Sequence, residues 1–442
     1  MKKFLLLTIL CILCLSYAEP SAAKVYIDLE APAVEKLPIA VQGFRYMGAE
    51  PASQKEAELL RHIRSEILGT LKSDLDFAGL FKTIDNDAFL EDPGKAGFFP
   101  EEISFRDWRM IGADALIEGR FTIEGKKLIV EVKLFDCVRE KTILGKRYIG
   151  STSKPRRLAH FFSDRLYMEL TGRPGVFTTK MLFVSKRTGN KEVYLSDYDG
   201  KNAVQITHNR SINLSPRWSP DGKKILYTSY KKGYPYLYML NIRTGRETVI
   251  SKKQGINIGG RFSPDGDLVA LTMSAKKSPE LYLLELSTGR FSRLTNNYSI
   301  DVSPTWSPDG KKIAFVSDRS GNPHIFVLEL PTGSTRRLTY KGKYNSSPAW
   351  SPDGKKIAFA CSENTGFHIC LTDPEDGRPL QITYEGNNKN PSWSPDGRFI
   401  VFSRTIGDKT QLYIMQSDGR GIRSITTGVG GETTPAWSPF LH

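Results

Sequence analysis

Trp306-Ser307-Pro308-Asp309-Gly310 is the stretch that decides the fold of this chain, because close copies of it recur at nearly even intervals. Five copies run through Asp-Gly and a sixth keeps only the aromatic residue with Ser-Pro. The aromatic residues are Trp218, Phe262, Trp306, Trp350, Trp393 and Trp437, spaced by 44, 44, 44, 43 and 44 residues. This period matches four short strands with their turns, the blade of a β-propeller, and such blades must pack around an axis to bury their apolar faces.

One repeat, residues 303–339, is predicted to hold four strands. After a short strand at 303–306, Ser307-Pro308-Asp309-Gly310 makes a turn in which Pro presets φ and Gly adopts φ > 0. Strands over 311–317, 324–330 and 335–339 follow. A second periodic marker frames the last strand, in the pairs Gly200/Thr207, Gly245/Ser251, Gly289/Thr295, Gly333/Thr339, Gly377/Thr383 and Gly419/Thr426. Both markers predict six blades.

The two ends of the repeat array predict how the ring closes. Residues 181–186, 192–197 and 203–207 supply three strands without an innermost one, and residues 432–437 supply an innermost strand with nothing after it. Together they make one blade, which removes the open edge that would invite aggregation. The fold class is therefore a multidomain chain whose all-β, six-bladed propeller is closed by the C-terminal strand.

Residues 24–172 predict a separate α/β domain of mixed strands and helices. Ser53 and Glu56 fit a capping box at the start of a helix. The apolar face of that helix is Leu59, Leu60, Ile63, Ile67, Leu68 and Leu71. Strands are expected at 25–29, 39–44, 115–123, 128–135 and 142–150, and further helices at 105–111 and 157–170. A hinge at 173–180 leads to the propeller at 181–442. The domain has no Gly-x-Gly-x-x-Gly or Walker loop.

Residues 1–23 have the pattern of a secretory signal peptide. Lys2 and Lys3 precede an apolar run of 12 residues, and small residues permit cleavage after Ala18 or Ala23. The run is too short to span a bilayer, and no later segment is apolar enough. We therefore expect an exported protein without a transmembrane segment.

Three cysteines follow the leader, at Cys137, Cys361 and Cys370. Cys361 ends one predicted strand and Cys370 lies in the next, so a disulfide between them is one alternative and two buried thiols the other. No Cys/His spacing resembles a zinc site, and neither a metal nor a cofactor is expected.

The net charge of +14 lies on the propeller. Residues 24–172 carry 23 Lys+Arg against 24 Asp+Glu, whereas residues 173–442 carry 37 against 23. In an exported protein this favours an acidic partner or an anionic surface over nucleic acid. A basic surface that serves only solubility, with Lys guarding strand edges, is the other interpretation.

The predicted working surface is formed by the segments that lead into the Trp-bearing strands. They are residues 208–214, 256–261, 299–303, 343–347, 387–390 and 430–434, rich in Asn, Ser, Gly and Thr. They differ between blades while the turns do not, and a propeller binds where its repeats differ. Ordinary polar loops would have the same composition.

The whole chain resembles the TolB family of periplasmic propeller proteins of the Tol–Pal system. The resemblance includes the leader, the α/β domain, Leu170-Thr171-Gly172, Ser196-Asp197-Tyr198-Asp199-Gly200, and Pro435-Ala436-Trp437-Ser438-Pro439 near the end. It implies a non-catalytic monomer that binds the lipoprotein Pal and the protein TolA, and that maintains outer-membrane integrity and invagination during cell division. The resemblance also implies further partners, namely other envelope proteins and segments of phages and colicins, and with them a role in protein import.

The resemblance also implies site residues. Pal contacts would lie at the propeller mouth, on Asn213, Ile256, Asn257, Arg261, Asp301, Val302, Ser303, Asn345, Asn390, Glu432 and Thr433. TolA contacts would lie in the mature N-terminal segment, on Lys24, Val25, Tyr26, Ile27, Asp28 and Leu29.

Two other function classes compete with a binding scaffold. A propeller-containing serine peptidase would need a Gly-x-Ser-x-Gly elbow and a larger second domain, and this chain has no such pentapeptide. A carbohydrate- or metal-binding propeller is suggested by Asp197-x-Asp199-Gly200, but a β-turn explains that stretch and no ligand set recurs in all blades. A binding scaffold is favoured.

Overall fold

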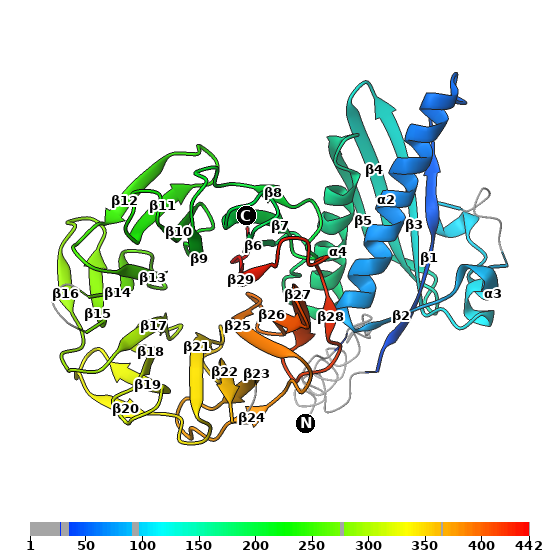
Figure 1. The fold of residues 1–442 in the computed structure, drawn as a ribbon. Helices are drawn as coiled ribbons and strands as arrows, with labels where there is room; N and C mark the ends of the chain where they lie inside the picture. Colours follow the sequence, from blue (N-terminus) through cyan, green and yellow to red (C-terminus); the bar gives the residue numbers. More distant parts are fainter. Residues whose placement is uncertain (1–26, 28–34, 91–96, 275–277, 364–365, 442) are drawn as a thin grey trace, which may run out of the picture. The chain divides into compact units, whose positions relative to one another are not determined.

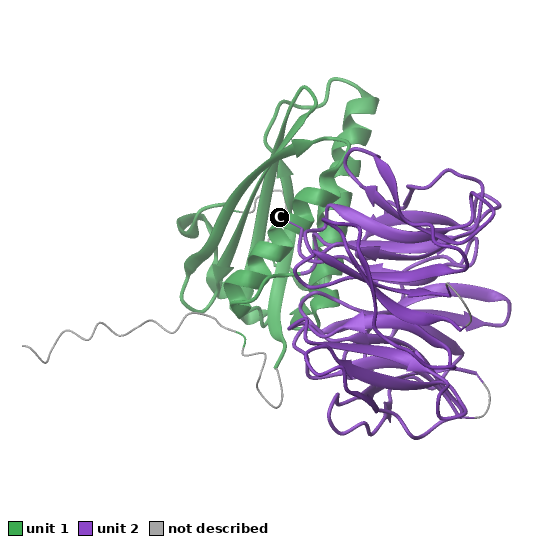
Figure 2. Cartoon of the chain, turned by 90° about the vertical axis from the view of Figure 1, so that its left-hand side faces the viewer, with its two compact units in different colours: residues 1–175 green, residues 176–442 purple. Residues whose placement is uncertain are grey.

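The computed structural model describes residue 27 and residues 35–90, 97–274, 278–363 and 366–441 (Figure 1). The chain divides into two compact units, Met1–Gly175 and Val176–His442, which are coloured separately in Figure 2. Within the described residues, no helix combines the length and the apolar character needed to cross a membrane.

The first unit is a mixed sheet with helices, as predicted. Its strands are β1 (Leu37–Tyr46), β2 (Phe81–Thr83), β3 (Ala115–Glu124), β4 (Lys127–Asp136) and β5 (Lys141–Ser151). They lie in the order β2-β1-β3-β4-β5. β1 is parallel to β2 and to β3, while β3, β4 and β5 form an antiparallel meander. The helices are α2 (Gln54–Ala78), α3 (Phe105–Met110) and α4 (Pro155–Thr171), with 3-10 turns at Asn86–Ala88 and Pro100–Glu102.

Helix α2 begins at the predicted cap. The Ser53 hydroxyl accepts a hydrogen bond from the Glu56 amide at 3.2 Å, whereas the Glu56 carboxylate accepts from the Ala52 amide at 3.0 Å and not from that of Ser53. The helix ends at Gly79, which has φ 70°. Of its predicted apolar face, Leu60, Ile63, Ile67 and Leu71 are buried, while Leu59 is 38% exposed. The capping residue and the apolar stripe together fix this helix against the sheet.

The second unit is a six-bladed propeller, which confirms the predicted fold. Figure 1 shows its sheets arranged around a common centre. The blades, innermost strand first, are β9-β10-β11-β12, β13-β14-β15-β16, β17-β18-β19-β20, β21-β22-β23-β24, β25-β26-β27-β28 and β29-β6-β7-β8. Neighbouring strands within every blade are antiparallel.

The strand bounds follow the predicted repeat closely. The innermost strands are β9 (Asn213–Trp218), β13 (Asn257–Phe262), β17 (Asp301–Trp306), β21 (Tyr344–Trp350), β25 (Asn387–Trp393) and β29 (Thr433–Trp437). The second strands are β10 (Lys224–Ser229), β14 (Leu268–Met273), β18 (Lys312–Ser317), β22 (Ile357–Ser362), β26 (Phe399–Ile406) and β6 (Lys180–Ser185). The third strands are β11 (Tyr236–Asn241), β15 (Glu280–Glu285), β19 (His324–Glu329), β23 (His368–Thr372), β27 (Lys409–Gln416) and β7 (Glu192–Asp197). The outermost strands are β12 (Glu247–Ser251), β16 (Phe291–Arg293), β20 (Thr335–Arg337), β24 (Leu380–Gln381), β28 (Arg423–Ser424) and β8 (Val204–Gln205).

The recurring tryptophan joins neighbouring blades. The Trp306 indole N–H donates to the Arg261 carbonyl at 3.1 Å, and Trp218 and Trp393 make the same bond to Ala436 and Ala349. Each bond runs from one innermost strand to the one before it. In these three blades the motif therefore supplies an inter-blade hydrogen bond in addition to aromatic area, whereas the Trp350 indole donates to the Gly354 carbonyl of its own turn at 3.1 Å.

The C-terminal strand closes the ring, as predicted. β29 pairs with β6, and the Lys180 amide donates to the Ser438 hydroxyl at 2.9 Å. The Trp437 indole donates to the Thr179 hydroxyl at 2.8 Å, and its side chain is 5% exposed. Residues 258 positions apart thus complete one blade.

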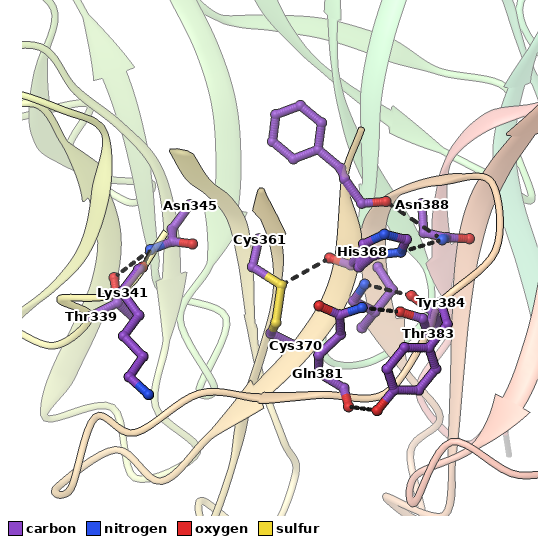
Figure 3. Close-up of a disulfide and its surroundings, with 12 residues drawn as sticks. Thr339, Lys341, Asn345, Cys361, His368, Cys370, Gln381, Thr383, Tyr384 and Asn388 are labelled. Carbon is purple, nitrogen blue, oxygen red and sulfur yellow. Dashed lines mark hydrogen bonds between the residues drawn. A yellow bond between two sulfur atoms is a disulfide. The ribbon is translucent and has the colours of Figure 1, made fainter. Parts of the chain in front are cut away.

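A disulfide joins the second and third strands of the fourth blade (Figure 3). Cys361 in β22 lies opposite His368, and Cys370 in β23 lies opposite Phe359, so the two cysteines are diagonal neighbours with Cα atoms 5.9 Å apart. Of the two alternatives left by the sequence, the structure has the disulfide. Cys137 is a free, buried thiol, and burial raises its pKa to about 12.

Candidate functional site

The six loops that lead into the innermost strands form one face of the ring. We call them the mouth loops: residues 208–212, 252–256, 296–300, 340–344, 384–387 and 427–431. Each loop connects the outermost strand of one blade to the innermost strand of the next, so all six lie at the same end of the propeller. The repeated architecture of the ring therefore presents six segments of different sequence at one end.

A ring of buried polar residues holds these loops. One such residue stands at or beside the start of each innermost strand: Asn213, Asn257, Asp301, Asn345, Asn388 and Glu432, all 0–1% exposed. The Asn213 amide group donates to the Lys191 carbonyl at 2.9 Å and to the Glu192 carboxylate at 2.8 Å. Asn345 donates to the Lys341 carbonyl at 2.9 Å and to the Thr339 hydroxyl at 3.1 Å (Figure 3). These side chains are structural braces.

Two members of the ring are carboxylates paired with arginine. Asp301 accepts from the Arg319 guanidinium at 2.8 Å and from the Asn297 amide at 2.7 Å. Glu432 accepts from Arg187 at 3.1 Å. Both carboxylates are 0% exposed, and a buried carboxylate is tolerated only when it is paired in this way.

The burial of this ring corrects part of the prediction made from the sequence. Five residues predicted to touch a partner are Asn213, Asn257, Asp301, Asn345 and Glu432, and none has side-chain surface to offer. They act on the face indirectly, because they fix the loops. The sequence prediction named this position in five of the six blades and missed Asn388, and spacing alone does not show which way a side chain points.

Two residues after its buried polar residue, every innermost strand has a β-bulge with left-handed backbone. The residues are Ser215, Gly259, Ser303, Ser347, Asn390 and Thr434, with φ between 48° and 68°. The pairing register of each innermost strand shifts around this point. Five of the six are followed by Pro, which needs no ladder partner. The sixth, Gly259, is followed by Gly260, where an added Cβ would lie 2.6 Å from a Leu237 methyl group and would require that side chain to move.

Five other predicted contact residues keep accessible side chains near the mouth. Ser303 is exposed, and Ile256, Val302, Asn390 and Thr433 are half-buried. The Ser347 hydroxyl donates to Asn390 at 3.2 Å, which links two neighbouring blades. Each of these residues lies within two positions of a buried polar residue at the mouth end of its strand, so the structure does bring them to one end of the propeller.

Arg261 lies elsewhere. It precedes Phe262 at the far end of its strand, and with Arg217, Pro264 and Pro308 it lines a cavity of about 280 Å³ at the Ser-Pro end of the channel. The prediction that Arg261 belongs to the mouth is therefore wrong, because the strand runs away from the mouth loops.

No exposed apolar residue of the mouth loops was named as a predicted contact, although Ile212, Ile300 and Tyr344 lie within the predicted segments. Ile212, Ile300 and Tyr344 directly precede the buried polar residues and are 47%, 46% and 44% exposed. Tyr298, Tyr340 and Tyr384 are 92%, 70% and 73% exposed, and Val429 is 63% exposed. Clustered exposed apolar side chains mark interaction surfaces. Their regular place, such as Tyr340 and Tyr384 directly after the periodic Thr, was a signal that the sequence contained.

The N-terminal segment is described only at Ile27. Its amide donates to the Leu170 carbonyl of α4 at 2.7 Å, and the side chain is 7% exposed. The other predicted TolA contacts, Lys24, Val25, Tyr26, Asp28 and Leu29, lie outside the described residues, as do the predicted strand 25–29 and the signal peptide. Across the described part of the chain, no three His, Cys, Asp or Glu residues cluster as metal ligands.

Comparison with known proteins points in one direction. The family model described as "TolB beta propeller domain" matches residues 167–441, and that described as "TolB amino-terminal domain" matches residues 25–143. The Tol-Pal system protein TolB of Syntrophotalea carbinolica is 41% identical over 224 residues, which are 51% of this chain and 49% of that protein. The protein of the same name from Geobacter metallireducens is 41% identical over 223 residues, 50% and 49% of the two chains.

These alignments cover about half the length of the curated relatives. A solved structure extends the likeness further. The crystal structure of TolB from Acinetobacter baumannii has a TM-score of 0.78 and 29% identity, and it covers 92% of this chain and 97% of that one. The similarity thus includes both the α/β unit and the propeller.

Proposed function

This chain belongs to the TolB family, and we propose that it is a non-catalytic periplasmic scaffold of the Tol–Pal system, binding Pal at the propeller mouth and TolA through its N-terminal segment. In this role it would maintain outer-membrane integrity and the invagination of the envelope during division. The observation that carries the proposal is the set of exposed apolar side chains on the mouth loops.

The mouth is suited to a folded protein partner. All six loops present accessible side chains, and five of them carry exposed large aromatic or aliphatic residues, which contribute most at protein interfaces. The buried ring beneath keeps the loops ordered, so little conformational entropy is lost on binding. Two aromatic side chains are held in place as well, since the Tyr384 hydroxyl donates to the Gln381 carbonyl at 2.8 Å and Arg337 lies 4.7 Å from the Tyr340 ring.

The proposal is tested by titrating the purified chain with the soluble domain of its own Pal. Ile300→Asp places a charge in the apolar face, and we expect Pal affinity to fall by about tenfold or more, as for a central interface contact. Val249→Asp is the matched control, because Val249 is 45% exposed on the outermost strand β12, away from the mouth. Equal affinity of the two variants for Pal would show that Pal does not bind at the propeller mouth.

The TolA half of the proposal has its own experiment. Within this segment, the backbone N–H of Ile27 donates to the Leu170 carbonyl at the end of α4. A mature chain without residues 24–29 should lose capture by the C-terminal domain of TolA and keep its affinity for Pal. Undiminished capture would show that TolA binds elsewhere.

A further inference from the structure

The cavity at the Ser-Pro end of the channel contains two arginines. Arg217 and Arg261 occupy equivalent positions of β9 and β13, 44 residues apart, so their side chains enter the cavity from neighbouring blades. The corresponding residues of the other four blades are Thr305, Ala349, Ser392 and Ala436. None of them is acidic, and no carboxylate lines the cavity.

The two guanidinium groups lack a counter-charge within the described chain. Arg217 donates to the backbone carbonyls of Pro216 at 2.7 Å and Pro435 at 3.4 Å, and neither arginine forms an ion pair there. The nearby turn aspartates are already engaged. Asp309, for example, accepts from the Ser307 hydroxyl and from the Lys311 amide.

Burial makes these two charges costly. It lowers the pKa of Arg217 to about 10. Burial, with the adjacent charge of Arg217 as a second cause, holds the pKa of Arg261 well below its ordinary value. Arginine nevertheless stays protonated near neutral pH, so two like charges line the same cavity, on side chains that are half-buried. An anion between them would reduce both the desolvation cost and the repulsion.

We propose that this cavity binds a small oxyanion, held by the guanidinium groups of Arg217 and Arg261. Arginine donates paired N–H groups that match carboxylate and phosphate oxygens. The Ser392 hydroxyl accepts from the Trp437 amide at 3.1 Å and keeps its own proton to donate, and Ser392 lines the same cavity. The positive excess of the propeller would raise the local concentration of anions. The site is at the opposite end of the channel from the mouth loops, so it is independent of the proposed Pal contact.

The shared chemistry, an oxyanion, has two sources: a free inorganic ion or a carboxylate of an acidic peptide. The full mature chain is titrated calorimetrically at constant ionic strength, in one arm with inorganic phosphate and in the other with an acetylated tri-glutamate peptide. Arg261→Gln and Arg217→Gln should each weaken binding by about tenfold or more. Arg243→Gln, an exposed arginine in the turn between β11 and β12, removes the same charge and should bind as the unsubstituted chain does.

Thermal unfolding gives a second readout. Loss of an arginine should weaken anion binding, but it should not lower the melting temperature of the chain without anion. Without added anion, Arg261→Gln should melt at the same or a higher temperature than the unsubstituted chain, because one of two repelling charges is gone. With the binding anion, only the unsubstituted chain and Arg243→Gln should gain stability. Binding that is equal in all variants, or absent in both arms for the unsubstituted chain, would overturn the proposal. Binding in one arm alone identifies the source.

Discussion

At the scale of single residues, the buried carboxylate of Asp301 gives a direct test of the bracing ring. Asp301→Ala leaves the Arg319 guanidinium without its partner and should lower the free energy of unfolding by about 3 kcal/mol. Urea denaturation measures this loss. Asp418→Ala is the control, because the ion pair between Asp418 and Arg420 is exposed and should contribute less than about 0.5 kcal/mol. Similar midpoints for the two variants would mean that the ring does not brace the loops.

Single residues are also where prediction from the sequence reached its limit. Asn213 and Ile212 are neighbours in a loop of ordinary composition, yet one is 0% exposed and the other 47%. A polar residue at the mouth was the natural candidate for a partner contact. Its burial depends on Glu192 and the Lys191 carbonyl from a preceding strand, and no local pattern reveals those partners.

At the scale of elements, the Ser-Pro-Asp-Gly turns predict an acid-sensitive contribution to stability. In three turns the Ser hydroxyl is the main cause that lowers the pKa of the Asp, at Asp221, Asp265 and Asp309. A lowered pKa means stability that is complete above the unfolded value of about 3.9 and is lost as pH falls through the folded value. Asp309→Asn should therefore lose less stability between pH 5 and pH 3 than the unsubstituted chain, measured by urea midpoints at each pH.

One turn supplies the control for this pH dependence. Burial raises the pKa of Asp396, so its ionised form opposes folding and its contribution has the opposite sign. Between pH 5 and pH 3, Asp396→Asn should lose at least as much stability as the unsubstituted chain does. If both substitutions flattened the profile equally, the Ser–Asp hydrogen bond would not be the cause.

Strands and helices were predicted well where their own sequence shows a turn motif or an apolar period. β18 and β19 begin and end within one residue of the expected strands, because turn chemistry and apolar runs both mark them. β2 was not predicted. It has three residues, Phe81–Thr83, and it exists through parallel pairing with β1. A strand that short has too few side chains to show a period.

At the scale of the whole molecule, ring closure makes the C-terminal strand essential to the propeller. Trp437→Ala removes a buried indole and its bond to Thr179, and it should cost about 3–5 kcal/mol of unfolding free energy. Deletion of residues 433–442 removes β29 entirely and should abolish the cooperative thermal transition of the propeller. Deletion of residues 441–442 alone, which leaves β29 intact, is the control. A full-height transition in the longer deletion would contradict closure.

The whole-molecule features were the easiest to predict from the sequence. Two periodic markers gave six blades, and the incomplete repeats at the two ends gave the strand exchange between β29 and β6. The direction of each innermost strand was also correct, but the position of Arg261 along that strand was assigned to the wrong end. Counting repeats fixes topology, whereas placing one side chain requires the geometry of the ring.

The pairing of β29 with β6 sets an order of events during folding. Lys180 at the start of β6 precedes its partner Ser438 by 258 positions, so this blade stays incomplete until β29 has been supplied. Each of the other five blades is contiguous in sequence and needs no distant strand. A chain that lacks β29 would therefore present an unpaired β6 edge, which is open to pairing with another copy.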